Sequence, residues 1–307
     1  RNIAWLFAFL AAVCLTAVFG VHRGIERLST CLMPIFFLLM IGLAAYSLLL
    51  PGSEAGLAYL FQFSWSTVTP QAILNAMGFT FFSLSLGAGV LVTYGAYVNK
   101  STRLPAAAMW VAILALQAAI LAGLVIMPAV FAYGLEPDAG PGLVFITLPM
   151  IFAQLSGGSV VAVIFYFCLF VAALTSAVSL LEVAVAFLQN ECRFSRRAAV
   201  FLCFAALFIL GSVSALSFGP WSDCLIFGRS IFDFLDYVCT NFLMTINGLA
   251  VAFVVGWKAW PKAMKELSTC SPENGVVTKG TLSAIGFGLR WLAPLMVLAS
   301  CWQGLEA

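Results

Sequence analysis

The chain has 307 residues, of which 63% are apolar and 8% are charged, with a formal net charge of +2. Soluble domains carry about 25% charged residues, so this chain lacks the polar surface of a soluble enzyme or a disordered chain. The small net charge also excludes the basic field of a nucleic-acid-binding protein. The apolar runs are continuous rather than alternating, which predicts an all-α polytopic membrane protein and not a barrel.

Apolar runs separated by polar breaks predict eight membrane spans, each near the length of about 20 residues that a helix needs to cross a bilayer. They are expected at residues 3–21, 25–50, 71–98, 104–134, 157–190, 196–216, 229–257 and 282–302. Two segments rich in Pro and Gly, 51–70 and 135–156, are expected outside the membrane. The apolar run at 145–149 is too short to span and is expected to pack into the mouth of the bundle.

Basic residues predict the orientation of the spans. Eleven of the 14 Lys and Arg residues lie in the alternate segments 22–27, 99–103, 191–197 and 258–281. The positive-inside rule places these four segments in the cytoplasm and the Arg1 end outside. The chain starts with Arg1 rather than Met and runs directly into an apolar segment, so we expect a processed chain or a part of a longer one. Eight spans that start outside are possible in themselves, and they are also what remains when an odd number of spans is missing from the front.

Predicted span 71–98 contains the sequence FFSLSLGAG at residues 81–89. Two serines and two glycines at mid-membrane depth favour either of two structures. One is a broken helix, whose first half ends near Ser83 and offers a cation its negative end, and whose second half starts near Gly89 and offers a carboxylate its positive end. The other is an unbroken helix that packs closely against a neighbour through its small residues.

Predicted span 157–190 carries Ala172, Thr175 and Ser176 on one helix face, because they are three and four residues apart. Their oxygens are hard ligands that suit a small alkali cation, but each hydroxyl could instead bond to a carbonyl of its own helix. Glu182 lies two turns further along, and an ionisable group inside a span is expected to be functional or paired.

Two further acids, Asp233 and Asp236, lie near the outer end of predicted span 229–257. Arg229 precedes Asp233 by four residues, so a local ion pair is one interpretation and a gate acid facing the permeation path is the other. The chain contains no metalloprotease, phosphate-binding or nucleophile-elbow motif, and His22 is its single histidine. We therefore expect no enzyme activity.

Several motifs, in order, resemble the neurotransmitter:sodium symporter family in its bacterial branch. They are GIER at 24–27, MP at 33–34, FFSLSLGAG at 81–89, TYGAYV at 93–98, FITLP at 145–149, GG at 157–158 and LTSAVSLLE at 174–182. The resemblance implies the inverted-repeat sodium-symporter fold, with the eight spans corresponding to the family's fourth to eleventh, in a bacterial inner (plasma) membrane. It divides the chain into 1–50 (last two helices of the first repeat), 51–70 (outside loop), 71–262 (second repeat), 263–281 (cytoplasmic loop) and 282–307 (final span and C-terminus).

The resemblance also implies roles for individual residues. Ala172, Thr175 and Ser176 match one half of the family's second sodium site, and Ser83 matches a ligand of the first. The positions that match the substrate pocket are Phe82, Ser83, Ser85, Gly87, Ala88, Ser176 and Leu180. Tyr97 matches the cytoplasmic gate, and Asp233 or Asp236 the outer gate acid. The small Ala88 leaves room for a larger, aromatic substrate side chain.

The chain departs from the family pattern at three positions. Ala115 stands where the first sodium site commonly has Asn or Asp, Phe79 stands where a glutamine is common, and Asn190 replaces the acid of the cytoplasmic gate. These departures weaken the expectation of a first sodium site and of a chloride role, whereas the second sodium site is better supported.

The function implied is sodium-coupled symport of an amino acid or related amine by alternating access, with the lipid bilayer as its environment and no nucleic-acid partner. The missing N-terminal spans would be required for a complete site, so we expect the 307 residues alone to show no sodium-dependent uptake. The alternative is a transport-inactive truncated or regulatory transporter-like membrane protein.

Overall fold

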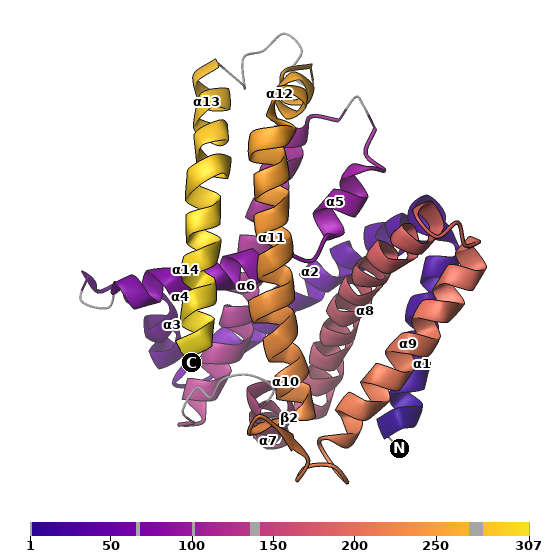
Figure 1. Ribbon diagram of the computed structural model, residues 1–307. Coiled ribbons are helices and arrows are strands. Elements are labelled where there is room, and N and C mark those ends of the chain that lie inside the picture. Colours follow the sequence, from indigo (N-terminus) through magenta and orange to yellow (C-terminus); the bar gives the residue numbers. More distant parts are fainter. Residues whose placement is uncertain (1, 66–67, 100–101, 136–141, 270–278, 307) are drawn as a thin grey trace. The chain divides into compact units, whose positions relative to one another are not determined.

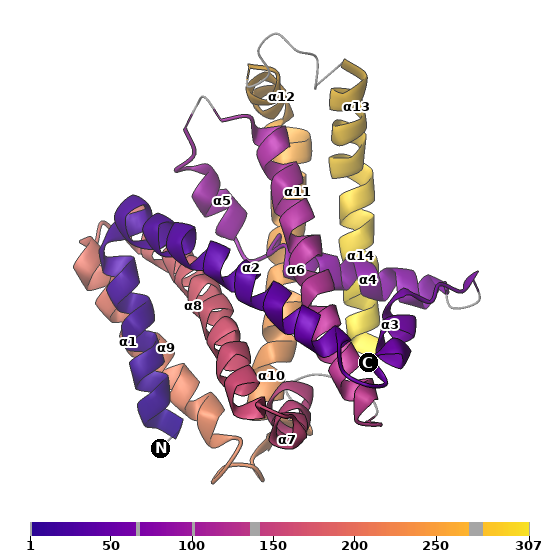
Figure 2. The same cartoon turned by 180° about the vertical axis from the view of Figure 1, so that it is seen from behind.

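The computed structural model describes residues 2–65, 68–99, 102–135, 142–269 and 279–306, and they are almost entirely helical (Figures 1 and 2). The chain forms two compact units. The first unit comprises residues 1–14, 68–112 and 179–307, and the second comprises residues 15–67 and 113–178. Helices α1 (Asn2–Val18), α6 (Leu104–Ala132) and α8 (Gly158–Asn190) each contribute residues to both units.

The remaining elements each belong to one unit. Those of the first unit are α4 (Pro70–Ser83), α5 (Val90–Gly95), α9 (Arg196–Leu216), β1 (Leu225–Ile226), β2 (Arg229–Ser230), α10 (Ile231–Tyr237), η4 (Val238–Leu243), α11 (Met244–Phe253), η5 (Val254–Lys258), α12 (Trp260–Thr269), α13 (Lys279–Phe287), η6 (Gly288–Leu292) and α14 (Ala293–Glu306). Those of the second are η1 (Val21–Glu26), α2 (Arg27–Leu48), α3 (Ser53–Phe61), η3 (Leu143–Thr147) and α7 (Leu148–Gln154). The η elements are π-helical turns, and β1 and β2 form an antiparallel pair.

Six helical runs among the described residues are long and apolar enough to cross a membrane. They are Val21–Leu48, Leu104–Ala132, Gly158–Asn190, Arg196–Leu216, Ile231–Lys258 and Leu282–Ala299. Each overlaps one predicted span. Of the other two predicted spans, 3–21 forms the shorter apolar helix α1, and 71–98 is divided between α4 and α5.

Some segments that the sequence predicts as connections are helical. The predicted loop 22–27 was wrong, because η1 runs directly into α2 and the chain turns at Gly20 instead, whose φ of +87° suits glycine. The outside segments 51–70 and 135–156 contain α3 and η3–α7. Close packing explains α3: a side chain at Gly56 would overlap the backbone of Met127 and Pro128.

The core of the second unit lies where α2, α6, α7 and α8 pack together. It contains Met40, Leu43, Val130, Leu148, Ile151, Phe152, Phe165 and Cys168. Two tyrosine hydroxyls satisfy carbonyl groups at its edge: Tyr46 donates to Ser156 O at 3.0 Å, and Tyr166 donates to Val144 O at 2.9 Å. Of the run 145–149, which was predicted to pack into the mouth of the bundle, Leu148 is fully buried in this core, whereas Phe145 and Ile146 are exposed.

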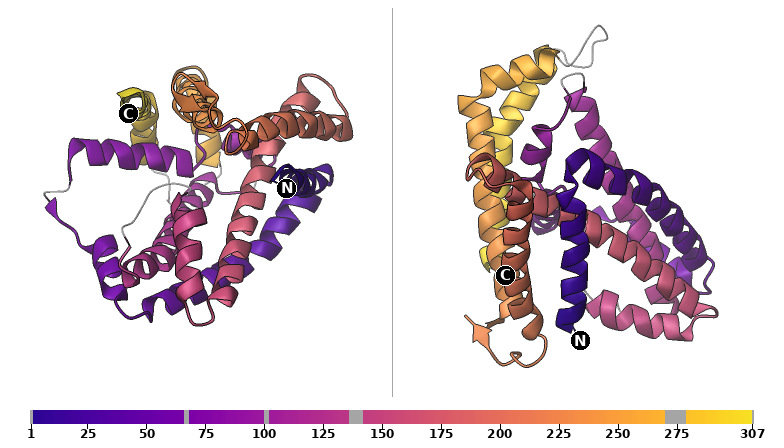
Figure 3. Two further views of the ribbon diagram at one scale, coloured as in Figure 1. Left: turned by 90° about the horizontal axis from the view of Figure 1, so that it is seen from below. Right: turned by 90° about the vertical axis from the view of Figure 1, so that its right-hand side faces the viewer.

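The first unit is held together by aromatic contacts and by crossing helices. The ring of Phe7 on α1 meets the edges of Phe204 and Phe208 on α9, with centroids 5.5 and 5.8 Å apart. Figures 1 and 3 show α1 and α9 side by side. In the same unit α14 runs beside α11 and packs across α4 (Figure 1). This crossing places the end of α4 next to α11.

Candidate substrate and ion site

The helix of predicted span 71–98 is broken at its centre. Thr69 caps its first half, α4, which ends at Ser83, and α5 begins only at Val90. Between them Ser85 and Gly89 adopt left-handed conformations, with φ of +51° and +78°. The broken-helix interpretation is therefore confirmed. The break frees polar backbone groups at a depth where only the protein can satisfy them.

Close packing through a small residue also occurs, at Gly87 inside the break. A Cβ atom added there would overlap the carbonyl group of Met244 at the start of α11. Asn247, one turn further along α11, donates from Nδ2 to the carbonyl oxygen of Gly87 at 2.7 Å. These two contacts join the break to α11.

The sequence analysis missed Asn247. An amide side chain in an apolar span was the available signal, because such a group seeks a hydrogen-bond partner inside the membrane. Its partner could not be found from the sequence, since the two residues are 160 positions apart.

The predicted substrate residues of the first unit lie at the break and on α8. Phe82 is 52% exposed and Ser83 is exposed, Ser85 and Ala88 are half-buried, and Gly87 is buried. Leu180, on the part of α8 that belongs to the same unit, is 51% exposed. Among the described residues, nothing encloses the side chains of Phe82 and Leu180 completely.

The predicted sodium ligands Ala172, Thr175 and Ser176 lie on the part of α8 that belongs to the second unit. The hydroxyl of Thr175 donates to the carbonyl oxygens of Val171 at 3.0 Å and of Ala172 at 3.1 Å. Bonding of this hydroxyl to its own helix is thus observed. Because a donating hydroxyl keeps its lone pairs, Thr175 Oγ1 can still ligate a cation. The side chain of Ser176 is exposed.

Glu182 on α8 is fully buried and paired. Both terminal nitrogens of Arg196, at the start of α9, donate to its carboxylate, at 2.5 and 3.1 Å. Arg196 also donates to Gln189 Oε1 at 3.2 Å, and the hydroxyl of Tyr97 donates to Glu182 Oε1 at 3.3 Å. The expectation that Glu182 is paired is confirmed. The sequence analysis missed this partner, because it used Arg196 only as one of the basic residues of segment 191–197 that indicate the orientation.

The acids near α10 have different surroundings. The hydroxyl of Ser230 accepts from the backbone N–H of Asp233 at 3.1 Å and donates to Asp233 Oδ2 at 2.6 Å, which is a reciprocal helix cap. Of the two interpretations, the ion pair of Arg229 with Asp233 is not observed among the described residues: the guanidinium lies over the Tyr237 ring, 4.4 Å from its centroid. A polar pocket of about 360 Å³ lies beside α10, and both acids line it. Asp236 takes no part in the cap.

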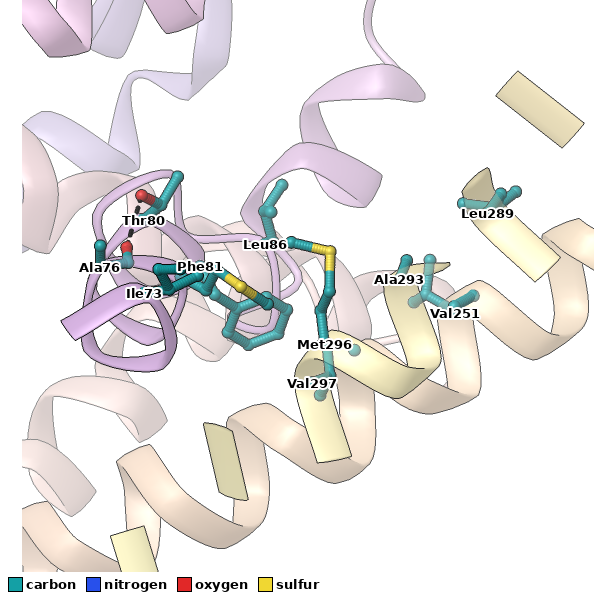
Figure 4. Close-up of a pocket in the computed structure, with 13 residues that line it drawn as sticks. Ile73, Ala76, Thr80, Phe81, Leu86, Val251, Leu289, Ala293, Met296 and Val297 are labelled. Carbon is teal, nitrogen blue, oxygen red and sulfur yellow. Dashed lines mark hydrogen bonds between the residues drawn. The ribbon is translucent and has the colours of Figure 1, made fainter. Parts of the chain in front are cut away.

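An apolar cavity of about 570 Å³ lies between α4, α11 and α14, and the sequence analysis did not predict it (Figure 4). Phe81 and Leu86, on either side of the break's first turn, point into it toward Met296 on α14 (Figure 4). Its polar lining includes the Thr80 hydroxyl, which already donates to Ala76 O at 2.7 Å. None of the predicted substrate residues lines this cavity.

A family model described as the sodium:neurotransmitter symporter family matches residues 2–279. The chain belongs to this family. An uncharacterized sodium-dependent transporter of Haemophilus influenzae is 38% identical over 91% of this chain and 60% of its own length. The sodium-dependent transporter YhdH of Bacillus subtilis, also uncharacterized, is 34% identical over 97% of this chain and 65% of its own. The chain thus spans less than two thirds of these curated relatives.

The chain also resembles the crystal structure of MhsT in complex with L-phenylalanine. The TM-score is 0.86 and the identity 39%, over 98% of this chain and 68% of MhsT. The likeness confirms the sodium-symporter fold. Because the family and these relatives are transporters, the expectation that the chain is not an enzyme is also confirmed.

Gly87→Ala should destabilise the protein by about 1–3 kcal/mol, because the added methyl group overlaps the Met244 backbone and forces the break away from α11. Thermal unfolding of the purified protein in detergent measures the loss. Gly95→Ala is the matched control, since nothing lies within 4 Å of its added Cβ. Equal unfolding temperatures for the two variants would contradict the packing described here.

Glu182→Gln should destabilise the protein by about 3 kcal/mol, because it leaves the half-buried Arg196 guanidinium without its counter-charge. The drop in unfolding temperature should be largely recovered in the double variant Glu182→Gln/Arg196→Met, which removes both charges. Arg197→Gln changes an exposed neighbouring arginine and should have little effect. If it destabilises as much as Glu182→Gln, the buried pair is not the cause.

Proposed function

We propose that this chain is the greater part of a sodium-coupled transporter of an amino acid, in which the break between α4 and α5 forms part of the substrate site. The observation that carries the proposal is the broken helix between α4 and α5 in a member of a sodium-symporter family. The names of the relatives support sodium as the coupling ion. The phenylalanine complex of MhsT supports an amino-acid substrate, and the small Ala88 favours an aromatic one.

The break supplies polar groups for an amino acid without unfolding the helix around it. At the end of α4 the Ser83 hydroxyl suits a cation or an ammonium group, whereas the carbonyl groups of Thr80, Phe81 and Phe82 already accept from backbone N–H groups. The N–H groups of Ser85, Leu86 and Ala88 donate to carbonyl groups of the same segment, so a carboxylate bound there would replace one or more of these bonds. Because α5 has only six residues, we assign its helix dipole no role in binding.

Sodium is transported with the substrate and would bind to oxygens of α8. Thr175 Oγ1 and the Ala172 carbonyl oxygen already lie 3.1 Å apart, so both can face one ion after a small rotation of the hydroxyl. Ser176 on the same face supplies a third oxygen. We propose that protein outside these 307 residues completes the site, in keeping with the longer relatives.

Two polar clusters of the first unit suit the gates. Tyr97, Glu182 and Arg196 form a closed hydrogen-bonded group whose opening would expose a buried carboxylate, and we assign it to the cytoplasmic gate. At α10 we assign the outer gate to Asp236. Both acids line the polar pocket, but the Asp233 carboxylate is engaged in the helix cap and that of Asp236 is not. The basic segments 22–27, 99–103, 191–197 and 258–281 would then lie on the cytoplasmic side of a bacterial inner membrane.

The test uses the complete reading frame that contains these residues, reconstituted in proteoliposomes. We expect saturable uptake of L-phenylalanine that requires an inward sodium gradient and disappears when potassium replaces sodium. Thr175→Val should raise the sodium concentration for half-maximal uptake by about tenfold or more, because the ion loses its contact with one hydroxyl oxygen. Ser159→Ala removes an exposed hydroxyl from the same helix and should have no effect.

Uptake of phenylalanine that is independent of sodium would contradict the proposal. Absence of uptake of any amino acid would favour the alternative, a transport-inactive regulatory protein. The 307-residue chain, reconstituted separately, should show no sodium-dependent uptake.

The assignment of the outer gate gives a separate prediction. Asp236→Asn should lower the kcat/KM for uptake by about tenfold, because the gate loses its charge, while the unfolding temperature changes little. Asp233→Asn should lower stability by about 1 kcal/mol, since it weakens the cap of α10, and should leave uptake nearly unchanged. The reverse pattern would assign the gate to Asp233.

A further inference from the structure

Cationic and aromatic residues gather where η5 ends and α12 begins, beside the α13–η6–α14 run. Figure 1 shows α12 next to α13. The cationic residues are Lys258, Lys262, Lys265 and Arg290, and the tryptophans are Trp257, Trp260 and Trp291. All belong to the first unit, and none takes part in the substrate or ion site. Arg290 lies inside the apolar run Leu282–Ala299, where an unpaired charge is costly, so its surroundings require explanation.

Arg290 is held in place by the backbone of η5. Its Nε donates to the carbonyl oxygen of Gly256 at 2.6 Å. That carbonyl is available because Pro261, five residues further on, has no N–H to close the next π-helical bond. Gly256 also permits the approach, since a Cβ atom there would lie only 3.2 Å from Arg290 Cγ.

An aromatic ring fixes the orientation of the same guanidinium. It lies over Trp260, 5.5 Å from the ring centroid, and Trp260 packs so tightly on Gly286 that an added Cβ would come within 2.6 Å of the ring. The hydrogen bond uses only Nε. Among the described residues no carboxylate pairs with Arg290, so its terminal N–H groups are available to an anion from outside the unit.

The surroundings have the composition of a membrane–water interface. On α12, Trp260, Ala263 and Leu267 are half-buried, whereas Pro261 and Lys262 are exposed, so the helix lies on the surface with its apolar face inward. The rings of Trp257 and Trp291 meet at 6.0 Å and are 42% and 57% exposed. Tryptophan is enriched at this depth in membrane proteins.

Lysines extend the positive charge around Arg290. Lys258 and Lys262 are exposed and have no carboxylate partner among the described residues. Lys265 and Glu266 on α12 are exposed, and each already interacts with another group. The cations that remain for an external anion are therefore Arg290, Lys258 and Lys262.

We propose that Arg290, with Lys258 and Lys262, binds the phosphate of an anionic phospholipid, such as phosphatidylglycerol, from the adjacent leaflet. A lipid fits better than free phosphate because the exposed rings of Phe253, Trp257 and Trp291 lie beside the cations and offer a surface for acyl chains. Basic residues just beyond a membrane helix attract anionic headgroups. This proposal does not depend on transport.

The test is a titration of lipid into the detergent-solubilised protein, with bound lipid counted by native mass spectrometry. We expect saturable binding of phosphatidylglycerol, weaker binding of phosphatidylcholine, and no displacement by millimolar inorganic phosphate. Arg290→Gln should raise the Kd for phosphatidylglycerol about fivefold, which corresponds to ~1 kcal/mol for each basic residue near an anionic headgroup. Arg27→Gln removes an exposed arginine at the start of α2 and should leave this Kd unchanged.

Equal Kd values for the two lipids, an unchanged Kd in Arg290→Gln, an equal loss in Arg27→Gln, or displacement by inorganic phosphate would each overturn the proposal. If Arg290→Gln yields no folded protein, the double variant Lys258→Gln/Lys262→Gln decides, because both side chains are exposed and their loss does not disturb packing. That variant should also raise the Kd, and an unchanged value would overturn the proposal.

Discussion

Backbone polar groups inside a bilayer must find partners within the protein, and the break between α4 and α5 depends on this constraint. The structure meets it with one amide: Asn247 on α11 donates to the Gly87 carbonyl, and the missing side chain of Gly87 allows α11 to come close enough. Gly248 on α11 likewise lacks a side chain, and this allows the ring of Phe81, just before the break, to pack against it. Small residues on both partners therefore maintain an unwound segment that an ordinary helix pair would close.

The buried charge of Glu182 obeys the same constraint by a different route. Its carboxylate is surrounded by Arg196 and Tyr97, so α8, α9 and the residues that follow α5 are tied together at one point. Removing either charge alone leaves the other without compensation in a medium where isolated ions are costly. Such an ion pair is stable while its two charges stay in contact. Because separating them costs free energy, intermediate arrangements are disfavoured and the pair is either formed or broken. This is the property that a gate requires.

Local signals in the sequence were sufficient for the helices, the break and the α8 hydroxyl face. Continuous apolar runs predicted the positions of all six long membrane-spanning runs, and the serines and glycines at 83–89 predicted the broken helix. Partners distant in sequence were not predictable. The bonds from Asn247 to Gly87 and from Arg290 to Gly256 depend on which helices pack together, and no local pattern records that. The helices α3, α7 and α12 within the predicted connections were missed for another reason: each has at most ten residues, and helices this short depend on tertiary contacts rather than on their own length.

The two sides of the break differ in how firmly they are held, and this difference bears on specificity. Gly87 is fixed to α11 by packing and by Asn247, whereas Phe81 and Leu86 face the apolar cavity, where fewer atoms restrain them. In the proposed site the backbone atoms of the substrate would lie near Ser85 and Gly87, on the fixed side. A site built in this way would hold the common part of an amino-acid substrate rigidly. It leaves discrimination between side chains to positions such as Phe82 and Ala88, whose substitution changes pocket size without disturbing the junction with α11.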